Sequence, residues 1–338
     1  MPQVRRNLGL PSGHKIFHFP FYYRCNRWRW SFPMIATLLA ISIVLLVVIV
    51  FAYFRWPQHV AVLLIGLNRK LSRLSLAQVA VGPHTVHYLQ GGTGPSVVLL
   101  HGIFAEKDHW VDFARPLTGS YQVFAPDLPG FGESGRFADQ EYHYEAQVER
   151  LRQWMDALGL TQVHLGGSSM GGTLSALFAV RYPQRVLSVA FIGAPHGLKT
   201  PRASTMDRQI EEGLCPLIVR SPAEFQQMFD FLFARRPFLP APIVKVAMAD
   251  AIANADSNVR LWQAQLQDRF LLDATLSQVT APSLALWGAQ DKLFDASGVE
   301  VIRTLQPMAQ VEVLEGVGHL PMMEAPARTA RRYRDFLG

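Results

Sequence analysis

Ser169 is the residue whose surroundings most clearly predict chemistry. The stretch 167–171 reads Gly-Ser-Ser-Met-Gly and matches the pattern G-x-S-x-G, between a short apolar run at 163–166 and a helical pattern at 170–182. A serine on such a strand-to-helix turn is presented above the edge of a sheet, and the flanking glycines let strand and helix approach closely. Ser168 is out of register with the second glycine. Ser169 is therefore the predicted nucleophile.

His319 is the predicted base for this serine. It follows the last expected strand, at 311–314, and so lies at the carboxyl edge of the sheet, where ligands bind in such folds. His101 is the alternative, but it precedes the serine and ends a strand, where we expect a structural or oxyanion-shaping role. His109 and His164 are expected to be structural.

Asp291 is the predicted carboxylate that fixes the imidazole tautomer and stabilises the imidazolium. It follows the expected strand at 283–287, and the chain order is then serine, aspartate, histidine. Asp295 is the alternative, and we expect it to cap the helix that follows. Asp127 also ends a strand, but it precedes the nucleophile and is expected to order its own loop.

The reaction at such a serine also needs two hydrogen-bond donors for the developing oxyanion. The backbone N–H groups of Met170, behind the nucleophile, and of Ile103, after His101-Gly102, are the expected pair. No His, Cys or carboxylate cluster has the spacing of a metal site, and no glycine loop for phosphate or a dinucleotide is present. We therefore expect neither a metal nor a cofactor.

The elements that must position these residues alternate between strand and helix from about residue 78 onward. Expected strands lie at 97–100, 122–125, 163–166, 186–192, 283–287 and 311–314, and expected helices at 141–158, 170–182 and 325–337. Such alternation predicts an α/β fold with a mostly parallel sheet covered by helices on both faces. No strand is convincing between 195 and 280, so we expect an inserted helical cap at about 198–275. Phe104, Phe229 and Phe233 are the expected lining of an apolar cleft.

The N-terminal part of the chain predicts a membrane anchor. Residues 34–54 carry no charge, enough for one membrane-spanning helix, with Tyr53 and Trp56 as interfacial aromatics. No acidic residue precedes Glu106, so the net charge of +6 comes from the basic segment 1–33 and from 55–76. Basic residues beside an apolar run suit anionic lipid, and nucleic acid is not an expected partner. The segment 55–76 reads as an amphipathic helix, lying on the bilayer or packed on the domain at 77–338.

The orientation of the anchor in the membrane is predicted from the basic residues, which are more numerous before the anchor than after it. This places the N-terminus inside and the catalytic domain outside the cytoplasm, as a single-pass protein of a bacterial inner membrane. Met34 is an alternative start of the protein, and without residues 1–33 the basic residues would lie mainly after the anchor and predict the opposite orientation. A homodimer is left open.

Several motifs together resemble a known family. They are His101 to Phe104, Asp127 to Gly132, Gly167 to Gly172, Trp287 to Asp291, and Gly318-His319. Over about 77–338 the chain resembles the α/β-hydrolase superfamily, and within it the abhydrolase-domain monoacylglycerol lipases and bacterial membrane-anchored lipases and phospholipases A. The resemblance implies the same triad on Ser169, Asp291 and His319.

The resemblance also implies hydrolysis of acyl esters of lipids such as monoacylglycerols or (lyso)phospholipids. The expected partners are thus a lipid acyl ester and the bilayer. A soluble-substrate esterase, a thioesterase or a carbon–carbon bond hydrolase is the alternative within enzymes. A ligand-binding protein on a retired hydrolase fold is the alternative outside them.

Overall fold

The computed structural model describes residues 32–338. Residues 1–31, which hold most of the expected basic segment, lie outside the described residues. The first helix, α1 (Phe32–Arg55), contains the expected span and is 24 residues long. Its window Pro33–Arg55 has a mean hydropathy of 3.2, and by length and composition it could cross a membrane. At 1.5 Å per residue it extends over roughly 36 Å, enough for the hydrocarbon core of a bilayer.

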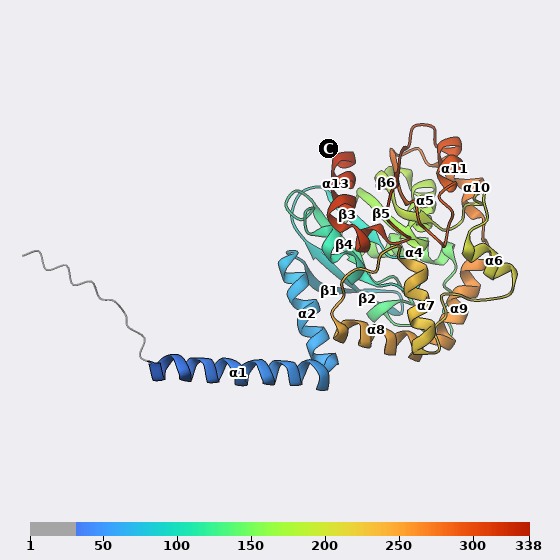
Figure 1. Cartoon of the computed structure of the whole chain (residues 1–338). Coiled ribbons are helices and arrows are strands. Elements are labelled where there is room, and N and C mark those ends of the chain that lie inside the picture. The colour runs from blue at the N-terminus through green and yellow to red at the C-terminus, as the bar shows by residue number, and fades with distance from the viewer. Residues whose placement is uncertain (1–31) are drawn as a thin grey trace, which may run out of the picture. The chain divides into compact units, whose positions relative to one another are not determined.

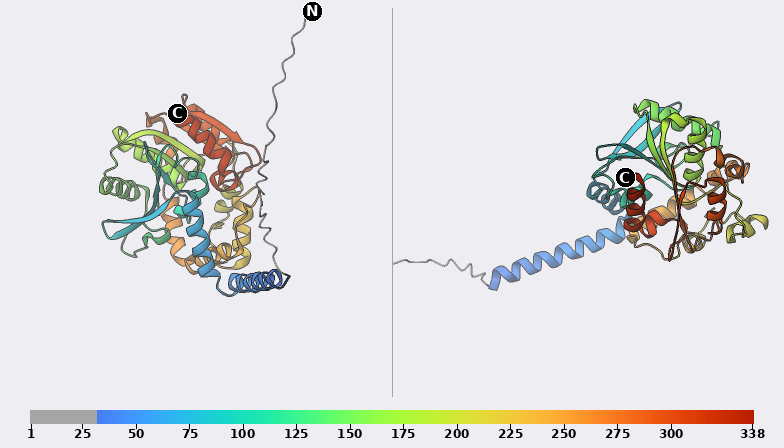
Figure 2. Two further views of the ribbon diagram at one scale, coloured as in Figure 1. Left: turned by 90° about the vertical axis from the view of Figure 1, so that its left-hand side faces the viewer. Right: turned by 90° about the horizontal axis from the view of Figure 1, so that it is seen from above.

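The centre of the remaining chain is one eight-stranded sheet (Figures 1 and 2). Its strands are β1 (Ser75–Val81), β2 (His84–Gly91), β3 (Ser96–Leu100), β4 (Gln122–Pro126), β5 (Val163–Ser169), β6 (Val186–Pro195), β7 (Ser283–Gly288) and β8 (Gln310–Leu314). The spatial order is β1-β2-β4-β3-β5-β6-β7-β8. The pairs β1–β2 and β2–β4 are antiparallel, and all the other pairs are parallel.

Helices follow the strands in the alternation that the sequence predicted. They are α2 (Pro57–Leu71), α3 (Val111–Ala114), α4 (Tyr144–Ala157), α5 (Met170–Arg181), α6 (Thr205–Glu211), α7 (Pro222–Leu232), α8 (Ala241–Ala253), α9 (Ala255–Leu266), α10 (Leu271–Thr275), α11 (Gly298–Leu305), α12 (Pro321–Glu324) and α13 (Pro326–Leu337). The predicted fold class, a mostly parallel sheet with helices on both faces and a helical insertion before the strand that carries the acid, is confirmed.

Two apolar cores lie on opposite faces of the sheet because successive side chains of a strand point to opposite sides. Val98 and Leu100 of β3 pack in the core that α4, α5 and α11 cover. Val97 and Leu99 of the same strand pack in the core that α3, α12 and α13 cover. The central strands are therefore buried on both faces, which explains why they read as unbroken apolar runs.

The structure adds an antiparallel hairpin that the sequence pattern did not predict. Strands β1 and β2 alternate exposed and buried residues, so they lack the continuous apolar run of the parallel strands. The helix expected over 55–76 ends at Leu71, where Arg73 takes a positive φ of 56° and turns the chain. Leu74 then enters the core beneath the sheet instead of continuing the helix.

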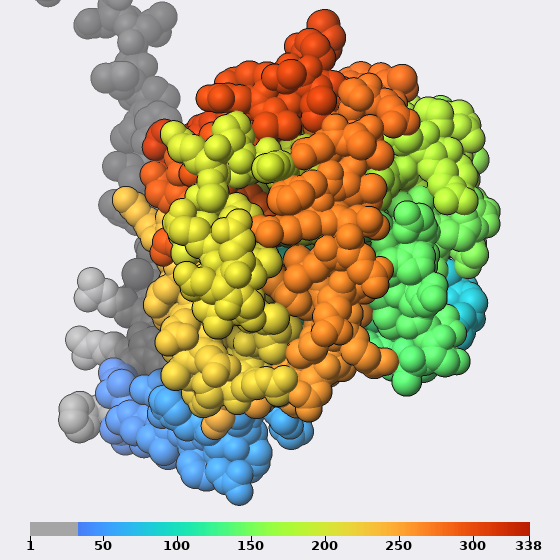
Figure 3. All heavy atoms as spheres, turned by 90° about the vertical axis from the view of Figure 1, so that its right-hand side faces the viewer, coloured from blue at the N-terminus to red at the C-terminus, as the bar shows by residue number. Residues whose placement is uncertain are grey.

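The insertion between β6 and β7 contains α6 to α10. In the space-filling view, its yellow and orange residues cover much of the visible face of the molecule (Figure 3). Two of its helices start from serine caps, Ser204 before α6 and Ser221 before α7, whose hydroxyl groups accept backbone N–H bonds. This insertion supplies one wall of the site described next.

Candidate active site

Ser169 occupies a strained turn between β5 and α5. Its φ of 52° and ψ of −119° lie outside the regions that residues with side chains usually adopt. The flanking glycines make this turn possible, since a Cβ on Gly167 would lie 2.2 Å from the carbonyl oxygen of Gly171. A Cβ on Gly171 would in turn lie 2.1 Å from the carbonyl oxygen of Leu100. The close approach inferred from the G-x-S-x-G pattern is thus present in the backbone.

Asp291 and His319 form a buried hydrogen-bonded pair. The imidazole Nδ1 lies 2.8 Å from Asp291 Oδ2, and both side chains are almost fully buried. The other carboxylate oxygen accepts the backbone N–H groups of Leu293, at 2.8 Å, and Phe294, at 3.1 Å. The carboxylate is therefore fixed by its own loop, and Nδ1–H of the histidine is the donor that this arrangement selects.

The serine and the histidine approach each other from the ends of β5 and β8, with β6 and β7 between these strands. A Cβ on Gly193 of β6 would lie 2.6 Å from the carbonyl oxygen of His319 and 3.2 Å from the hydroxyl of Ser168, so the two loops meet there. The Phe294 ring packs on the His319 ring, with centroids 5.4 Å apart, and lines the same pocket as Ser169. Within residues 32–338 the Ser169 hydroxyl and the His319 imidazole make no hydrogen bond. Catalytic hydrogen bonds of this kind are often longer in free enzymes than in substrate complexes.

The loop after β3 runs directly beside the nucleophile. A Cβ on Gly102 would lie 3.2 Å from Cβ of Ser169, a tight contact, so the glycine favours this close approach of the backbone. Ile103 and Met170, the expected oxyanion donors, both line the pocket into which Ser169 opens. The next residue, Phe104, has a φ of 56°, which turns the loop away.

A buried ion pair holds this loop in place. Lys107, which is fully buried, donates from its backbone N–H and from Nζ to the Asp127 carboxylate, each at 2.7 Å. Its Nζ also lies 2.7 Å from the Glu133 carboxylate. Burial opposes the lysine charge, but these two carboxylates outweigh that effect and raise the pKa of Lys107. Asp127 thus orders the loops on both sides of it, which is the role that the sequence suggested.

A second ion pair joins the same loop to α2. Arg69 donates to both carboxylate oxygens of Asp108, at 2.7 and 2.5 Å, in the two-pronged geometry typical of arginine. Glu106, near this pair, has its pKa raised to about 7 by burial and by the neighbouring charges of Asp108 and Asp127. The helix that follows α1 is therefore connected to the loop beside the nucleophile.

The alternative residues have other partners. His101 is buried, with Nδ1 2.7 Å from the carbonyl of Gly102 and Nε2 accepting the N–H of Leu128. Burial lowers the pKa of His101, so the neutral ring that these bonds require is favoured. Asp295 accepts the N–H of Ser297 and pairs with Arg202 at the surface. It sits just before α11, whose N-cap is Ser297 rather than Asp295.

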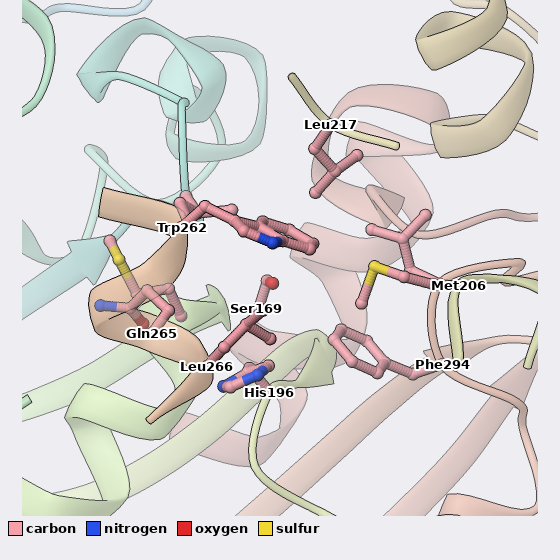
Figure 4. Close-up of a pocket in the computed structure, with 11 residues that line it drawn as sticks. Ser169, His196, Met206, Leu217, Trp262, Gln265, Leu266 and Phe294 are labelled. Atoms are coloured by element: carbon pink, nitrogen blue, oxygen red, sulfur yellow. The ribbon is translucent and has the colours of Figure 1, made fainter. Parts of the chain in front are cut away.

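Apolar side chains form most of the pocket in front of Ser169 (Figure 4). Its lining residues are Ile103, Ser169, Met170, His196, Met206, Leu217, Trp262, Gln265, Leu266, Leu293 and Phe294. The free volume is about 20 Å³, the space of roughly one water molecule. The Trp262 ring lies across the pocket from the serine hydroxyl. A bulky substrate can therefore enter only if side chains of the insertion move.

The expected aromatic lining was wrong for this pocket, since Phe104, Phe229 and Phe233 are not among its residues. Phe229 lies between the rings of Phe225 and Phe233 along α7 and its C-cap, with centroids 4.7 and 5.5 Å away. Phe233 belongs to a buried core and Phe229 packs against that core, so these two rings hold α7 to the rest of the domain. Aromatic residues at helical spacing here build the insertion instead of its cleft. No pattern in the sequence distinguishes the two roles.

His196 was missed by the sequence analysis although it follows β6 directly, at the edge where the site lies. Its Nδ1 is 2.8 Å from the Tyr144 hydroxyl, and its ring stacks on Tyr144. Burial, with a contribution from Arg269, lowers the pKa of His196 to about 4, so the ring is neutral at neutral pH. Its position after a parallel strand was the signal that could have identified it.

Comparison with known proteins assigns the family. A model of the alpha/beta hydrolase fold matches residues 95–326. The chain belongs to the α/β-hydrolase family. This hydrolase is 32% identical to lipase 1 of Psychrobacter immobilis over 280 residues, which cover 80% of this chain and 85% of that one. It is 30% identical to monoacylglycerol lipase abhd6-B of Xenopus laevis, with 73% and 76% covered.

A solved structure extends the comparison. The crystal structure of a membrane phospholipase A, described as a bacterial virulence factor, matches the hydrolase with a TM-score of 0.81 and 38% identity. The match covers 90% of this chain and 98% of that one. The resemblance that the sequence motifs predicted is confirmed, and the chain is a carboxylic ester hydrolase.

Proposed function

We propose that this hydrolase cleaves acyl esters of lipids, such as monoacylglycerols or (lyso)phospholipids, through an acyl-enzyme on Ser169. The observation that carries the proposal is the strained serine turn that opens into an apolar pocket beside the buried Asp291–His319 pair. The relatives support the lipid substrate, since two of those named above are lipases and one is a phospholipase.

In the first half of the reaction, His319 accepts the proton of the Ser169 hydroxyl while the serine oxygen attacks the ester carbonyl. The negative charge that develops on the carbonyl oxygen is held by the backbone N–H groups of Ile103 and Met170. His319 then gives its proton to the departing alcohol oxygen, and the acyl group remains on Ser169. Asp291 keeps the imidazole in the required tautomer and stabilises its positive charge.

In the second half, water loses a proton to His319 and attacks the acyl carbonyl. The C–O bond to Ser169 breaks, the proton returns to the serine oxygen, and the fatty acid leaves. An apolar pocket suits an acyl chain because neither the pocket wall nor the chain carries polar groups that would lose hydrogen bonds to water when the chain is buried. Entry requires the Trp262 side chain to move, since the free volume is small.

We infer further that α1 anchors the enzyme in a bacterial inner membrane with the catalytic domain outside the cytoplasm. The exposed Cys215 reports the side on which the domain lies. In intact cells made permeable only at the outer membrane, an impermeant maleimide should label Cys215 in a Cys25→Ser background. Labelling only after cell lysis would reverse the orientation.

Two measurements on the full chain in detergent test the catalytic proposal. A fluorophosphonate probe should label the wild type and Ser168→Ala, which removes the adjacent buried hydroxyl, but not Ser169→Ala. Fatty acid release should then be compared for a monoacylglycerol, a lysophospholipid and a short-chain p-nitrophenyl ester. Release from the short ester alone would contradict the lipid substrate, and an unlabelled folded wild type would contradict the serine mechanism.

A further inference from the structure

Phe238 lies on the surface of the insertion with no cover from the rest of the described chain. It belongs to the loop between the end of α7 at Leu232 and the start of α8 at Ala241, and it is 93% exposed. A phenylalanine side chain left in water forgoes the stabilisation that its burial would bring. A single exposed apolar residue is ordinary, so the meaning of Phe238 depends on what lies around it.

This loop is bonded to the last turn of α1. The backbone N–H of Ala241 donates to the Tyr53 hydroxyl at 3.0 Å. Phe238 is three residues from Ala241 and therefore within about 11 Å of it. A tyrosine at the end of a membrane-spanning helix lies at the level of the lipid headgroups. If α1 crosses a bilayer, Phe238 is within reach of the same level.

Helix α2 adds a second apolar surface in the same part of the molecule. It packs beside α8 (Figure 1), while its outward side exposes Val62, Leu63, Leu67 and Leu71 by 72, 69, 51 and 62%. These residues follow α1 directly in the chain, and Phe54 in the last turn of α1 is itself 72% exposed. The apolar surface is thus continuous in sequence with the anchor.

The two chain segments that carry these residues contain basic but no acidic side chains, and their acidic partners, such as Asp108 for Arg69 and Asp230 for Arg236, come from outside the segments. No Asp or Glu occurs from Ala52 to Ala105 or from Phe231 to Ala249. The two stretches contain Lys70, Arg73, Arg235 and Lys245 among their basic residues. Basic residues near an anionic membrane surface are attracted to it. Exposed apolar residues in segments that are rich in basic residues and contain no acidic ones have the composition of a surface that rests in the headgroup region.

We propose that Phe238 and the exposed side of α2 form a membrane-contact surface that inserts into the boundary between headgroups and acyl chains. The inference rests on the proposed function only for the anchoring of α1. Contact at Phe238 holds the insertion against the bilayer, and the same insertion supplies Trp262 and Leu217 to the pocket. The substrate then reaches Ser169 from the membrane and not from bulk water.

The test measures where single nitroxide labels lie when the full chain is reconstituted in vesicles of phosphatidylcholine and phosphatidylglycerol. In a background of Cys25→Ser and Cys215→Ser, the label is attached at Phe238→Cys, Met308→Cys or Ile43→Cys. Met308 is the matched control, since it is also 93% exposed and lies in the loop between α11 and β8. Ile43, in the middle of α1, reports whether the anchor is inserted.

Collision rates with oxygen, which concentrates in lipid, and with a water-soluble nickel chelate then locate each label. We expect oxygen to dominate at positions 43 and 238 and the nickel chelate to dominate at 308. A label at 238 that is as accessible to nickel as the label at 308, with 43 inserted, overturns the membrane-contact surface alone. A water-exposed label at 43 overturns the anchor and the surface together.

A second copy of the chain is the other occupant that could cover Phe238. Dipolar broadening between labels at 238 that disappears on dilution with unlabelled protein would show contact between copies and overturn the proposal. None of these readings requires turnover. Failure of the catalytic proposal would therefore leave the position of the label as informative as before.

Discussion

The two walls of the pocket are built on different principles. On the sheet side, Ser169, Gly102 and the Asp291 loop are fixed by main-chain contacts, in which an added Cβ would meet backbone atoms or the nucleophile itself. On the insertion side, Trp262 and Leu217 present apolar side chains over a volume of about 20 Å³. The chemistry is thus held by backbone geometry, whereas access depends on side chains that can change rotamer.

The largest effect on the rate is expected at Asp291, which lies on the sheet side of the pocket and is hydrogen-bonded to His319. Asp291→Asn should lower kcat by roughly 10⁴-fold, because an amide in place of the carboxylate favours the wrong histidine tautomer. Asp295→Asn is the control, since that carboxylate lies four residues away and pairs with Arg202. Ester hydrolysis by purified proteins measures both. Loss of activity in Asp295→Asn with retention in Asp291→Asn would reverse the assignment of the acid.

The strained turn gives the next effect, on stability as well as on rate. Gly171→Ala places a Cβ 2.1 Å from the Leu100 carbonyl oxygen, and overpacking of this kind costs roughly 1–3 kcal/mol or more. Gly119→Ala is the control, because no atom lies within 4 Å of its added Cβ. Thermal unfolding in detergent should separate the two variants. Equal unfolding temperatures would mean that the turn is more adaptable than its contacts indicate.

Substitutions on the insertion side should change the preference among substrates and leave the catalytic steps at Ser169 intact. Trp262→Leu enlarges the pocket, so the ratio of kcat/KM for long over short acyl esters should rise by roughly tenfold, the lower end of the effect of one methylene in an apolar pocket. Phe229→Leu is the matched control, because it changes an aromatic residue of the insertion that does not line the pocket. A larger change in Phe229→Leu than in Trp262→Leu would show that the substrate follows another route.

The smallest expected effect is a pH dependence of the protein's stability that arises from Glu106, in the loop that is connected to α2. Burial raises the pKa of Glu106 from its usual value of 4.5 to about 7. Between pH 4.5 and about 7 the folded protein therefore keeps a proton on Glu106 that the unfolded chain has released. The free energy of unfolding therefore falls as the pH rises through this range. Glu106→Gln should unfold at a higher temperature than the wild type at about pH 8, with a smaller difference at about pH 5. A difference that is constant with pH would contradict this origin.

The sheet side was predictable from the sequence because its signals are local. The buried parallel strands read as short apolar runs, and the G-x-S-x-G pattern predicted the strand-to-helix turn at Ser169 from five residues. Chain order and the carboxyl edge of the sheet then predicted Asp291 and His319 as its partners, and the structure pairs these two. The β1–β2 hairpin was missed because its two strands are half exposed. The helix expected over 55–76 ends at Leu71, and the chain turns at Arg73.

The insertion side was less predictable. Phe229 and Trp262 are both aromatic residues in helices, and nothing in their neighbours along the chain says which one faces Ser169. His196 and the Lys107–Asp127 ion pair were likewise found only in three dimensions.

The sequence by itself determined the position of the Ser169 turn, the predicted chain order of serine, aspartate and histidine, the parallel sheet and an apolar helix long enough to span a membrane. Each of these follows from a pattern within a few residues or from the edge at which a strand ends. Only the tertiary structure decided which side chains close the pocket, how α2 is connected to the loop beside Ser169, and that the start of α8, just after the Phe238 loop, is bonded to Tyr53. These contacts join residues far apart in the chain, and the packing that brings them together has no local signature.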